Sequence, residues 1–177
     1  KAARLYAEQS SQNLVVNVDL FSCRTEDMFY KEFAKAVIAA TNTSFGDFVA
    51  AAMKYLSRFA PVFSSSDPLG SYEFSFGIDV RDKKMDFSEI LDLPQKIAQE
   101  KGKKIIVCID EFQTIKEYGD TLAFQRTLRS HWQEHTDVAY CLYGSKRNMM
   151  IDLFADSNNP FYKFGDLILL QKISRND

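Results

Sequence analysis

Residues 103–113 read "KKIIVCIDEFQ", in which an apolar run from Ile105 to Ile109 leads directly into two adjacent carboxylates, Asp110 and Glu111. A short, β-branched apolar run of this kind predicts a strand that is buried on both faces of a sheet. Carboxylates at the end of such a strand are costly unless a cation or hydrogen-bond donors meet them. The stretch therefore predicts a buried strand with a functional site at its end.

Strand-like and helix-like segments alternate on both sides of this stretch. The chain has 177 residues, 46% of them hydrophobic, which is enough for one domain with a substantial core. Alternation of this kind predicts an α/β domain with a mainly parallel sheet. Thr25 and Ser88 are candidate helix N-caps, and Gly102 is expected to end a helix. The expected strands are 14–21, 105–109, 138–145 and 166–173, with a hairpin or edge strand near 72–78; the expected helices are 1–9, 25–41, 45–59, 87–102, 121–135 and 148–156.

Composition argues against several classes of protein. The net charge of -2, from 22 basic and 24 acidic residues, gives no reason to expect a nucleic-acid or membrane surface. No apolar run approaches the roughly 18 residues of a membrane span, and no signal segment opens the chain, so a soluble cytoplasmic protein is expected.

Cysteines and histidines give no clear metal or disulfide pattern. Cys23, Cys108 and Cys141 lack the CxxC spacing, so we expect three buried free thiols in a reducing compartment. His131 and His135 have the i, i+4 spacing of some zinc sites but no HExxH pattern and no third ligand. A solvated helix face is the expected setting of these two histidines.

Polar residues follow two of the expected strands. Ligands of open α/β sheets bind at the carboxyl ends of the strands, where Asp110 and Glu111 lie. The run "VAYCLYGS" brings Ser145 to the same edge, with Gly144 allowing close backbone approach. The basic pair Lys146 and Arg147 follows, either to face phosphate or to form the solvated start of a helix. Helix capping by the acidic residues or by Ser145 remains an alternative.

Four segments in a fixed order carry a family resemblance. They read "GKKIIVCIDEFQ", "LRSHW", "YCLYGSKRNMMIDLF" and "NPFYKFGDLILLQKI". Together they resemble the prokaryotic, archaeal-type P-loop ATPases of the AAA+/STAND kind, over most of the chain and most strongly from Lys103 onward. The resemblance implies a three-layer αβα P-loop NTPase-like domain with a mainly parallel sheet.

The resemblance also implies roles for individual residues. Asp110 corresponds to the Walker B acid, which associates with Mg²⁺ through water, and Glu111 to the catalytic base or the residue that orients the attacking water. Ser145 takes the sensor 1 position, and Gln113 is the supporting residue of the DEFQ signature. ATP and Mg²⁺ are the implied cofactors. The residues implied to bind them are Asp110, Gln113 and Arg147.

The chain departs from the family in one large respect. It contains no G-x-x-x-x-G-K-[ST] loop, and its only Gly-Lys, at 102–103, has Ile97 where the first glycine belongs. The opening "KAARLYAEQ" matches the helix that follows this loop in the family. We therefore expect residues 1–177 to be a partial ATPase core, truncated before Lys1, without P-loop, lid or C-terminal domains. In the family, the missing first strand lies between the sensor 1 strand and the last strand.

Two functions lead at this point, and a third, a doubly wound fold with another carboxylate-dependent phosphotransfer chemistry, stays open only if Asp110 and Ser145 lie far apart. The resemblance implies a Mg²⁺-dependent ATPase that binds and hydrolyses ATP and drives or switches attached domains, as a homo-oligomer or with another protein. This chain by itself is expected to be inactive because the phosphate-binding loop is missing. The alternative is a non-catalytic interaction domain that keeps the ATPase-like fold. Neither nucleic acid nor a membrane is indicated as a partner.

Overall fold

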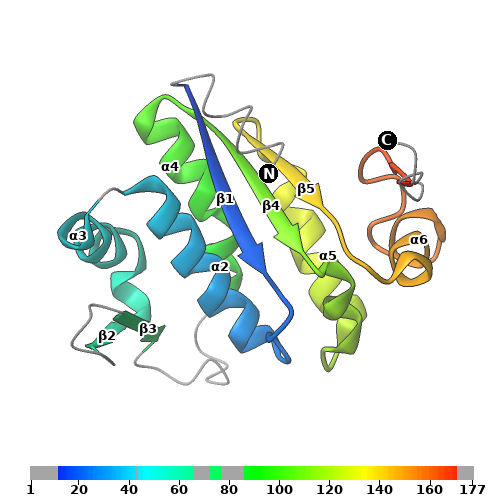
Figure 1. The fold of residues 1–177 in the computed structure, drawn as a ribbon, viewed down its shortest axis with the longest axis horizontal. Coiled ribbons are helices and arrows are strands. Elements are labelled where there is room, and N and C mark those ends of the chain that lie inside the picture. The colour runs from blue at the N-terminus through cyan, green and yellow to red at the C-terminus, as the bar shows by residue number, and fades with distance from the viewer. Residues whose placement is uncertain (1–11, 43, 66–71, 77–85, 171–177) are drawn as a thin grey trace, which may run out of the picture.

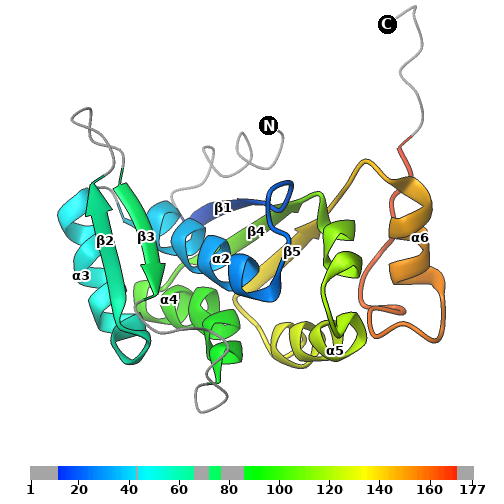
Figure 2. The ribbon, with the colours of Figure 1, turned by 90° about the horizontal axis from the view of Figure 1, so that it is seen from below.

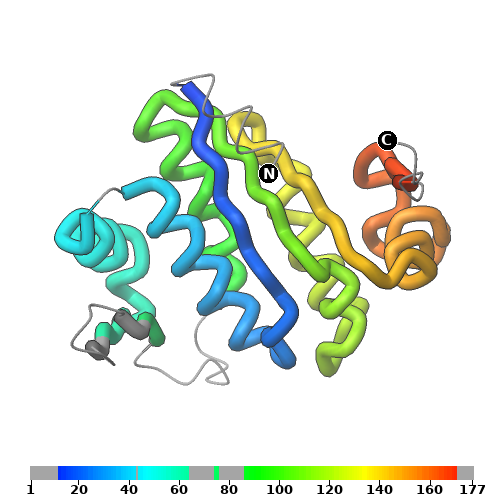
Figure 3. The backbone as a smooth tube through the Cα atoms, in the orientation of Figure 1, coloured from blue at the N-terminus to red at the C-terminus, as the bar shows by residue number. Residues whose placement is uncertain are grey.

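A three-stranded parallel sheet with the order β1–β4–β5 organises the computed structural model of the chain (Figure 1). The structure describes residues 12–42, 44–65, 72–76 and 86–170, so the helix expected at 1–9 lies outside the described residues. β4 is the central strand, and the tube in Figure 3 follows the three strands side by side. The strands are β1 (Asn13–Asp19), β4 (Lys104–Asp110) and β5 (Val138–Leu142).

Helices pack against one face of this sheet. α2 (Glu26–Thr41), α4 (Leu93–Lys101) and α5 (Thr121–Trp132) lie together on that face, as the two perpendicular views show (Figures 1 and 2). The strand residues on the helical side are buried, and the large helix side chains that meet them are aromatic or aliphatic. These buried residues are Val16, Val18, Ile105, Val107, Ile109, Phe29, Phe33, Val37, Ile38, Ile97, Leu128 and Trp132.

Smaller elements flank the sheet. α3 (Phe45–Leu56) lies beside an antiparallel hairpin of β2 (Pro61–Ser65) and β3 (Tyr72–Phe76), and α6 (Arg147–Ala155) lies beyond β5. The 3-10 helices are η1 (Ser57–Phe59), η2 (Phe87–Asp92) and η3 (Phe112–Glu117). Of the two alternatives expected near 72–78, the hairpin is the one formed, and it is separate from the main sheet.

Local sequence signals explain most helix boundaries. Thr25 caps α2, because its side chain accepts a hydrogen bond from the backbone N–H of Met28 at 3.3 Å. Gly102 ends α4 in the left-handed region at φ 60°, which glycine adopts without strain. The expectation for Ser88 was wrong: Asp86 is the capping residue of η2, and its carboxylate accepts from the Ser88 N–H at 2.9 Å.

The expected last strand is not formed where it can be checked. Residues 166–170 belong to no strand, and Ile168 and Leu170 are 78% and 87% exposed; 171–173 lie outside the described residues. A strand needs a hydrogen-bonded neighbour, and no described strand lies beside the outer edge of β5. The main sheet of the described residues therefore has three strands instead of the four expected.

The second face of the sheet differs from the helical face. Asn17, Ala139 and Cys141 point to it and are exposed, whereas Cys108 is buried at the centre. The α/β class with a parallel sheet is confirmed, but within the described ranges the helices cover one face only. The prediction that all three cysteines are buried holds for Cys23 and Cys108 and is wrong for Cys141, which lies on the face that no described helix covers.

Candidate functional site

The carboxyl ends of β4 and β5 bring Glu111 and Ser145 together. Two backbone hydrogen bonds continue the strand pairing past the sheet: Tyr143 N–H donates to the Ile109 carbonyl, and Phe112 N–H to the Tyr143 carbonyl, both at 3.0 Å. The Ser145 hydroxyl then donates to Oε2 of Glu111 at 3.0 Å. Residues 34 positions apart in sequence thus share one hydrogen bond at the edge expected for ligands.

Glu111 has an unusual backbone conformation. Its φ is 51°, in the left-handed region, where a non-glycine residue costs about 1–3 kcal/mol. This turn separates the strand from η3, and the Glu111 side chain makes no capping hydrogen bond to that helix. The neighbouring Asp110 accepts the Glu111 N–H on Oδ1 at 2.8 Å. Helix capping therefore does not explain why a glutamate occupies position 111.

The buried side chain of Gln113 forms a hydrogen bond with the Glu111 carboxylate. Its Nε2 donates to the same Oε2 of Glu111 that accepts from Ser145, and the Gln113 side chain is only 1% exposed. Gly144 makes room for it, because a Cβ at position 144 would lie 1.8 Å from Oε1 of Gln113. Oε1 of Gln113 is itself buried without a hydrogen-bond partner among the described residues. The pairing of Gln113 with Gly144 could not be read from the sequence.

The surroundings favour the charged form of Glu111. Hydrogen bonds from Gln113 and Ser145 are the main causes that lower the pKa of Glu111, with a smaller contribution from the Lys146 ammonium. Lys146 also forms an ion pair with Glu117 at 3.3 Å. Glu111 is therefore a carboxylate at neutral pH, able to accept a hydrogen bond or a proton from water.

Asp19 is a further carboxylate at this edge that sequence reasoning missed. The β1–β4 register sets Asp19 directly beside Asp110, and its Oδ1 accepts from the Phe21 N–H at 2.8 Å. The signal was available, since Asp19 ends its apolar strand as Asp110 does. Carboxylate and hydroxyl oxygens are the donors that Mg²⁺ prefers, often with one or two protein carboxylates and waters.

This donor set fits Mg²⁺ held jointly with phosphate rather than an all-protein metal site. Among the described residues, no group of three or more His, Cys, Asp or Glu side chains is arranged to hold a metal. Arg147, the expected phosphate residue, is exposed at the start of α6, and no described hydrogen bond or ion pair joins its side chain to Glu111, Gln113 or Ser145.

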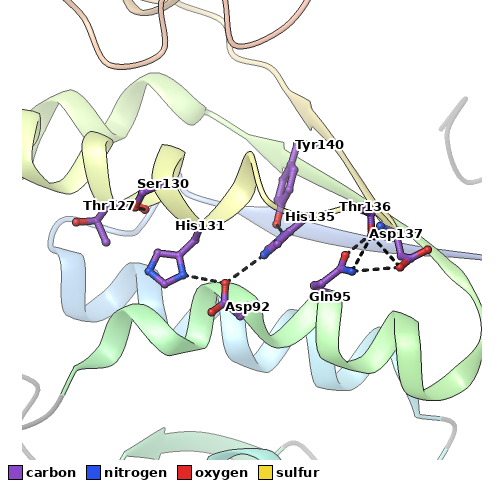
Figure 4. Close-up of polar contacts among 9 residues, drawn as sticks. All are labelled: Asp92, Gln95, Thr127, Ser130, His131, His135, Thr136, Asp137 and Tyr140. Carbon is purple, nitrogen blue, oxygen red and sulfur yellow. Dashed lines mark hydrogen bonds and ion pairs between the residues drawn. The ribbon is translucent and has the colours of Figure 1, made fainter.

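The two histidines belong to a different, partly buried network (Figure 4). Asp92 Oδ1 lies 2.8 Å from Nδ1 of His131 and 3.2 Å from Nε2 of His135, and Nδ1 of His135 lies 2.8 Å from the Tyr140 hydroxyl. The His135 side chain is 3% exposed, and burial lowers its pKa. The expected solvated face is therefore wrong: these residues tie α5 and β5 to the end of η2.

Solved structures resemble the chain at low sequence identity. A Walker-type ATPase of Pyrococcus abyssi matches with a TM-score of 0.53 and 16% identity, over 91% of this chain and 41% of that one. Cdc6p of Pyrobaculum aerophilum matches with a TM-score of 0.42 and 12% identity, over 92% of this chain and 33% of that one, which is too weak to add to the argument. No family model and no curated protein matches the chain.

The first of these likenesses concerns the fold alone. It agrees with an α/β domain that contains a parallel sheet, and this chain spans about two fifths (41%) of the length of the Pyrococcus abyssi ATPase. Within the described ranges, the helices are too short or too polar to pass through a bilayer.

Proposed function

We propose that this chain is the Walker B and sensor 1 part of a P-loop ATPase core that binds and hydrolyses ATP with Mg²⁺. The observation that carries the proposal is a pair of hydrogen bonds, which Gln113 and Ser145 donate to the Glu111 carboxylate at the carboxyl ends of two neighbouring parallel strands. A carboxylate oriented from two sides and kept in its charged form suits the task of orienting a water molecule for attack on a phosphoryl group.

Each polar residue then has a separate task. Asp110, with Asp19 beside it, supplies carboxylate oxygens for Mg²⁺ and its waters, and the metal neutralises charge on the phosphate oxygens when bound. Glu111 accepts a hydrogen bond from the attacking water, while Ser145 and Gln113 fix the direction of its carboxylate. Arg147, exposed at the start of α6, is proposed to reach the phosphates from that helix.

We further propose that the family's first strand and phosphate loop precede residue 1 in the natural protein and complete the sheet at β5. Two observations support this arrangement. The outer edge of β5 is paired with no described strand, and the apolar side chains of 167–170 are exposed beyond it. Covering apolar surface stabilises a fold by roughly 25 cal/mol per Å², so an inserted strand would bury what is now exposed.

The test of catalysis compares two glutamates in the natural gene product that contains this chain. Glu111→Gln should keep ATP binding by calorimetry and reduce single-turnover hydrolysis by about 10²–10⁴-fold, the usual contribution of a positioned base. Glu117→Gln is the matched control, because Glu117 lies on the neighbouring η3 and pairs with Lys146 at the surface. It should leave hydrolysis near the wild-type rate.

Other outcomes would contradict the proposal in different ways. Unchanged hydrolysis in the Glu111→Gln protein would remove Glu111 from the reaction. Absence of ATP binding and hydrolysis in the natural product would favour the non-catalytic interaction domain instead. Micromolar ATP binding by the 177-residue chain alone would contradict the assigned role of the phosphate loop.

A further inference from the structure

Cys108 and Cys141 are direct neighbours on adjacent parallel strands. The β4–β5 register pairs Cys108 with Cys141, so the two residues lie side by side at the same level of the sheet. Paired residues of neighbouring parallel strands point to the same face, and the strands are about 4.8 Å apart. Disulfides accept Cα separations of about 4.4–6.8 Å, so the spacing of the two strands meets this requirement for a bond between the two residues.

The two thiols differ in access to solvent. Both alternate along their strands with residues of the core such as Val107 and Ile109, so they lie on the sheet face opposite the helices. Cys141 is exposed, whereas Cys108 is 4% exposed and sits between β1 and β5 on the central strand. A reagent in solution therefore reaches Cys141 before Cys108.

Cys23 has a different setting and serves as an internal reference. It is buried after β1, and its Sγ lies 3.9 Å from the backbone carbonyls of both Asp19 and Met28. No register pair of the described strands joins it to Cys108 or Cys141. Burial raises its pKa to about 11, so it is protonated and slow to react at neutral pH.

We propose that Cys108 and Cys141 form a redox-active dithiol that reacts with low-molecular-weight disulfides such as oxidised glutathione. The Cys141 thiolate attacks one sulfur of the reagent; the reagent S–S bond breaks and one thiolate leaves. The Cys108 thiolate then attacks Sγ of Cys141 and expels the second thiolate. Two protein thiols are oxidised to one disulfide, the reagent is reduced to two thiols, and the two protein protons end on those thiols.

The resulting bond would join the two strands that carry the candidate site. Cys108 precedes Asp110 by two residues on β4, and Cys141 precedes Ser145 by four residues on the chain that follows β5. The proposal does not rest on ATP hydrolysis, since it concerns two thiols whose placement is independent of Glu111.

Mass spectrometry of the 177-residue chain tests the proposal. The folded chain is treated with oxidised glutathione, quenched with N-ethylmaleimide and unfolded. We expect the loss of two hydrogens, alkylation of Cys23 alone, and a disulfide between the tryptic peptides 105–116 and 130–146. Cys23→Ala should cross-link as the wild type does. Cys108→Ala should stop at a glutathione adduct on Cys141, and Cys141→Ala should lose the cross-link without gaining an adduct.

Three results would overturn the proposal. A lasting glutathione adduct on wild-type Cys141 would show that Cys108 cannot reach it. Cross-links through Cys23, or the same mixture of pairings from the folded and the urea-unfolded chain, would show that the fold does not select this pair. Three freely alkylated cysteines would show that Cys141 does not react. The wild-type peptide map decides these cases even if a variant fails to fold by circular dichroism.

Discussion

Replacing Gly144 with alanine tests the packing that supports Glu111. The new Cβ would lie 1.8 Å from Oε1 and 2.9 Å from Cδ of Gln113, and 3.3 Å from Sδ of Met150. Real Cβ atoms do not approach heavy atoms within 3.0 Å, so Gln113 must move, and its 1% exposure leaves no open space for that movement. Gly144 does not have a left-handed backbone, so the cost comes from packing rather than from φ.

The expected loss of stability has two parts. Overpacking in a filled interior costs about 1–3 kcal/mol. Moving Gln113 also breaks its hydrogen bond to the Glu111 carboxylate, and hydrogen bonds to charged groups contribute about 1.5–3 kcal/mol, less here because Glu111 is partly solvated. We therefore expect the free energy of unfolding to fall by about 2–4 kcal/mol.

Urea unfolding followed by the fluorescence of Trp132, the single tryptophan, measures this loss. Trp132 is 2% exposed, so its emission should change on unfolding. Gly119→Ala is the matched control, because a Cβ there meets no atom within 4 Å, and its effect should stay within about 0.5 kcal/mol. Combining Gly144→Ala with Gln113→Ala removes the clashing atoms, so the double variant should be about 0.5–3 kcal/mol more stable than the sum of the single effects.

Two results would refute this reasoning. A Gly144→Ala protein as stable as the Gly119→Ala protein would mean that Gln113 moves without cost. Strict additivity of the Gly144 and Gln113 substitutions would mean that the two side chains do not compete for the same space.

Two further predictions concern α5 and the turn that follows it. Since burial lowers the pKa of His135 below its ordinary value of about 6.5, the unfolded chain binds more protons, and stability should fall as the pH falls from about 6.5 towards the lower folded pKa and then level off. Urea titrations of His135→Gln should show a smaller fall, and an unchanged pH slope would contradict the assignment to His135. Arg129 donates to two backbone carbonyls within 160–162, so Arg129→Met should lower the free energy of unfolding by about 1.5–3 kcal/mol. The exposed Arg126→Met on the same helix should have little effect, and equal losses from the two variants would count against these bonds.

The predictable parts of the fold depend on neighbours in sequence. The strand at 105–109 follows from an unbroken apolar run, the start of α2 from Thr25, and the end of α4 from Gly102. The meeting of Glu111 with Ser145 also followed from a local rule, since each ends a strand and parallel strands end at one edge.

The unpredicted parts depend on partners distant in sequence. The apolar pattern of 166–173 indicates a preference for burial but not the neighbour that a strand needs, and the described part of that segment has none. Cys141 lies in an apolar run, yet exposure depends on what covers each face of the sheet. The contact between Gln113 and Gly144 joins a 3-10 helix to the end of another strand, and no sequence period specifies it.

At position 111, the left-handed backbone favours one kind of residue for folding, while the site contains another. Folding alone favours glycine or asparagine where φ is 51°, because these residues adopt that conformation at little cost. A library of substitutions at position 111 ranked by folding yield should therefore place those two residues first and glutamate below them. Glutamate at this position is best understood as an exception to the preferences of the fold, maintained by the carboxylate that Gln113 and Ser145 hold.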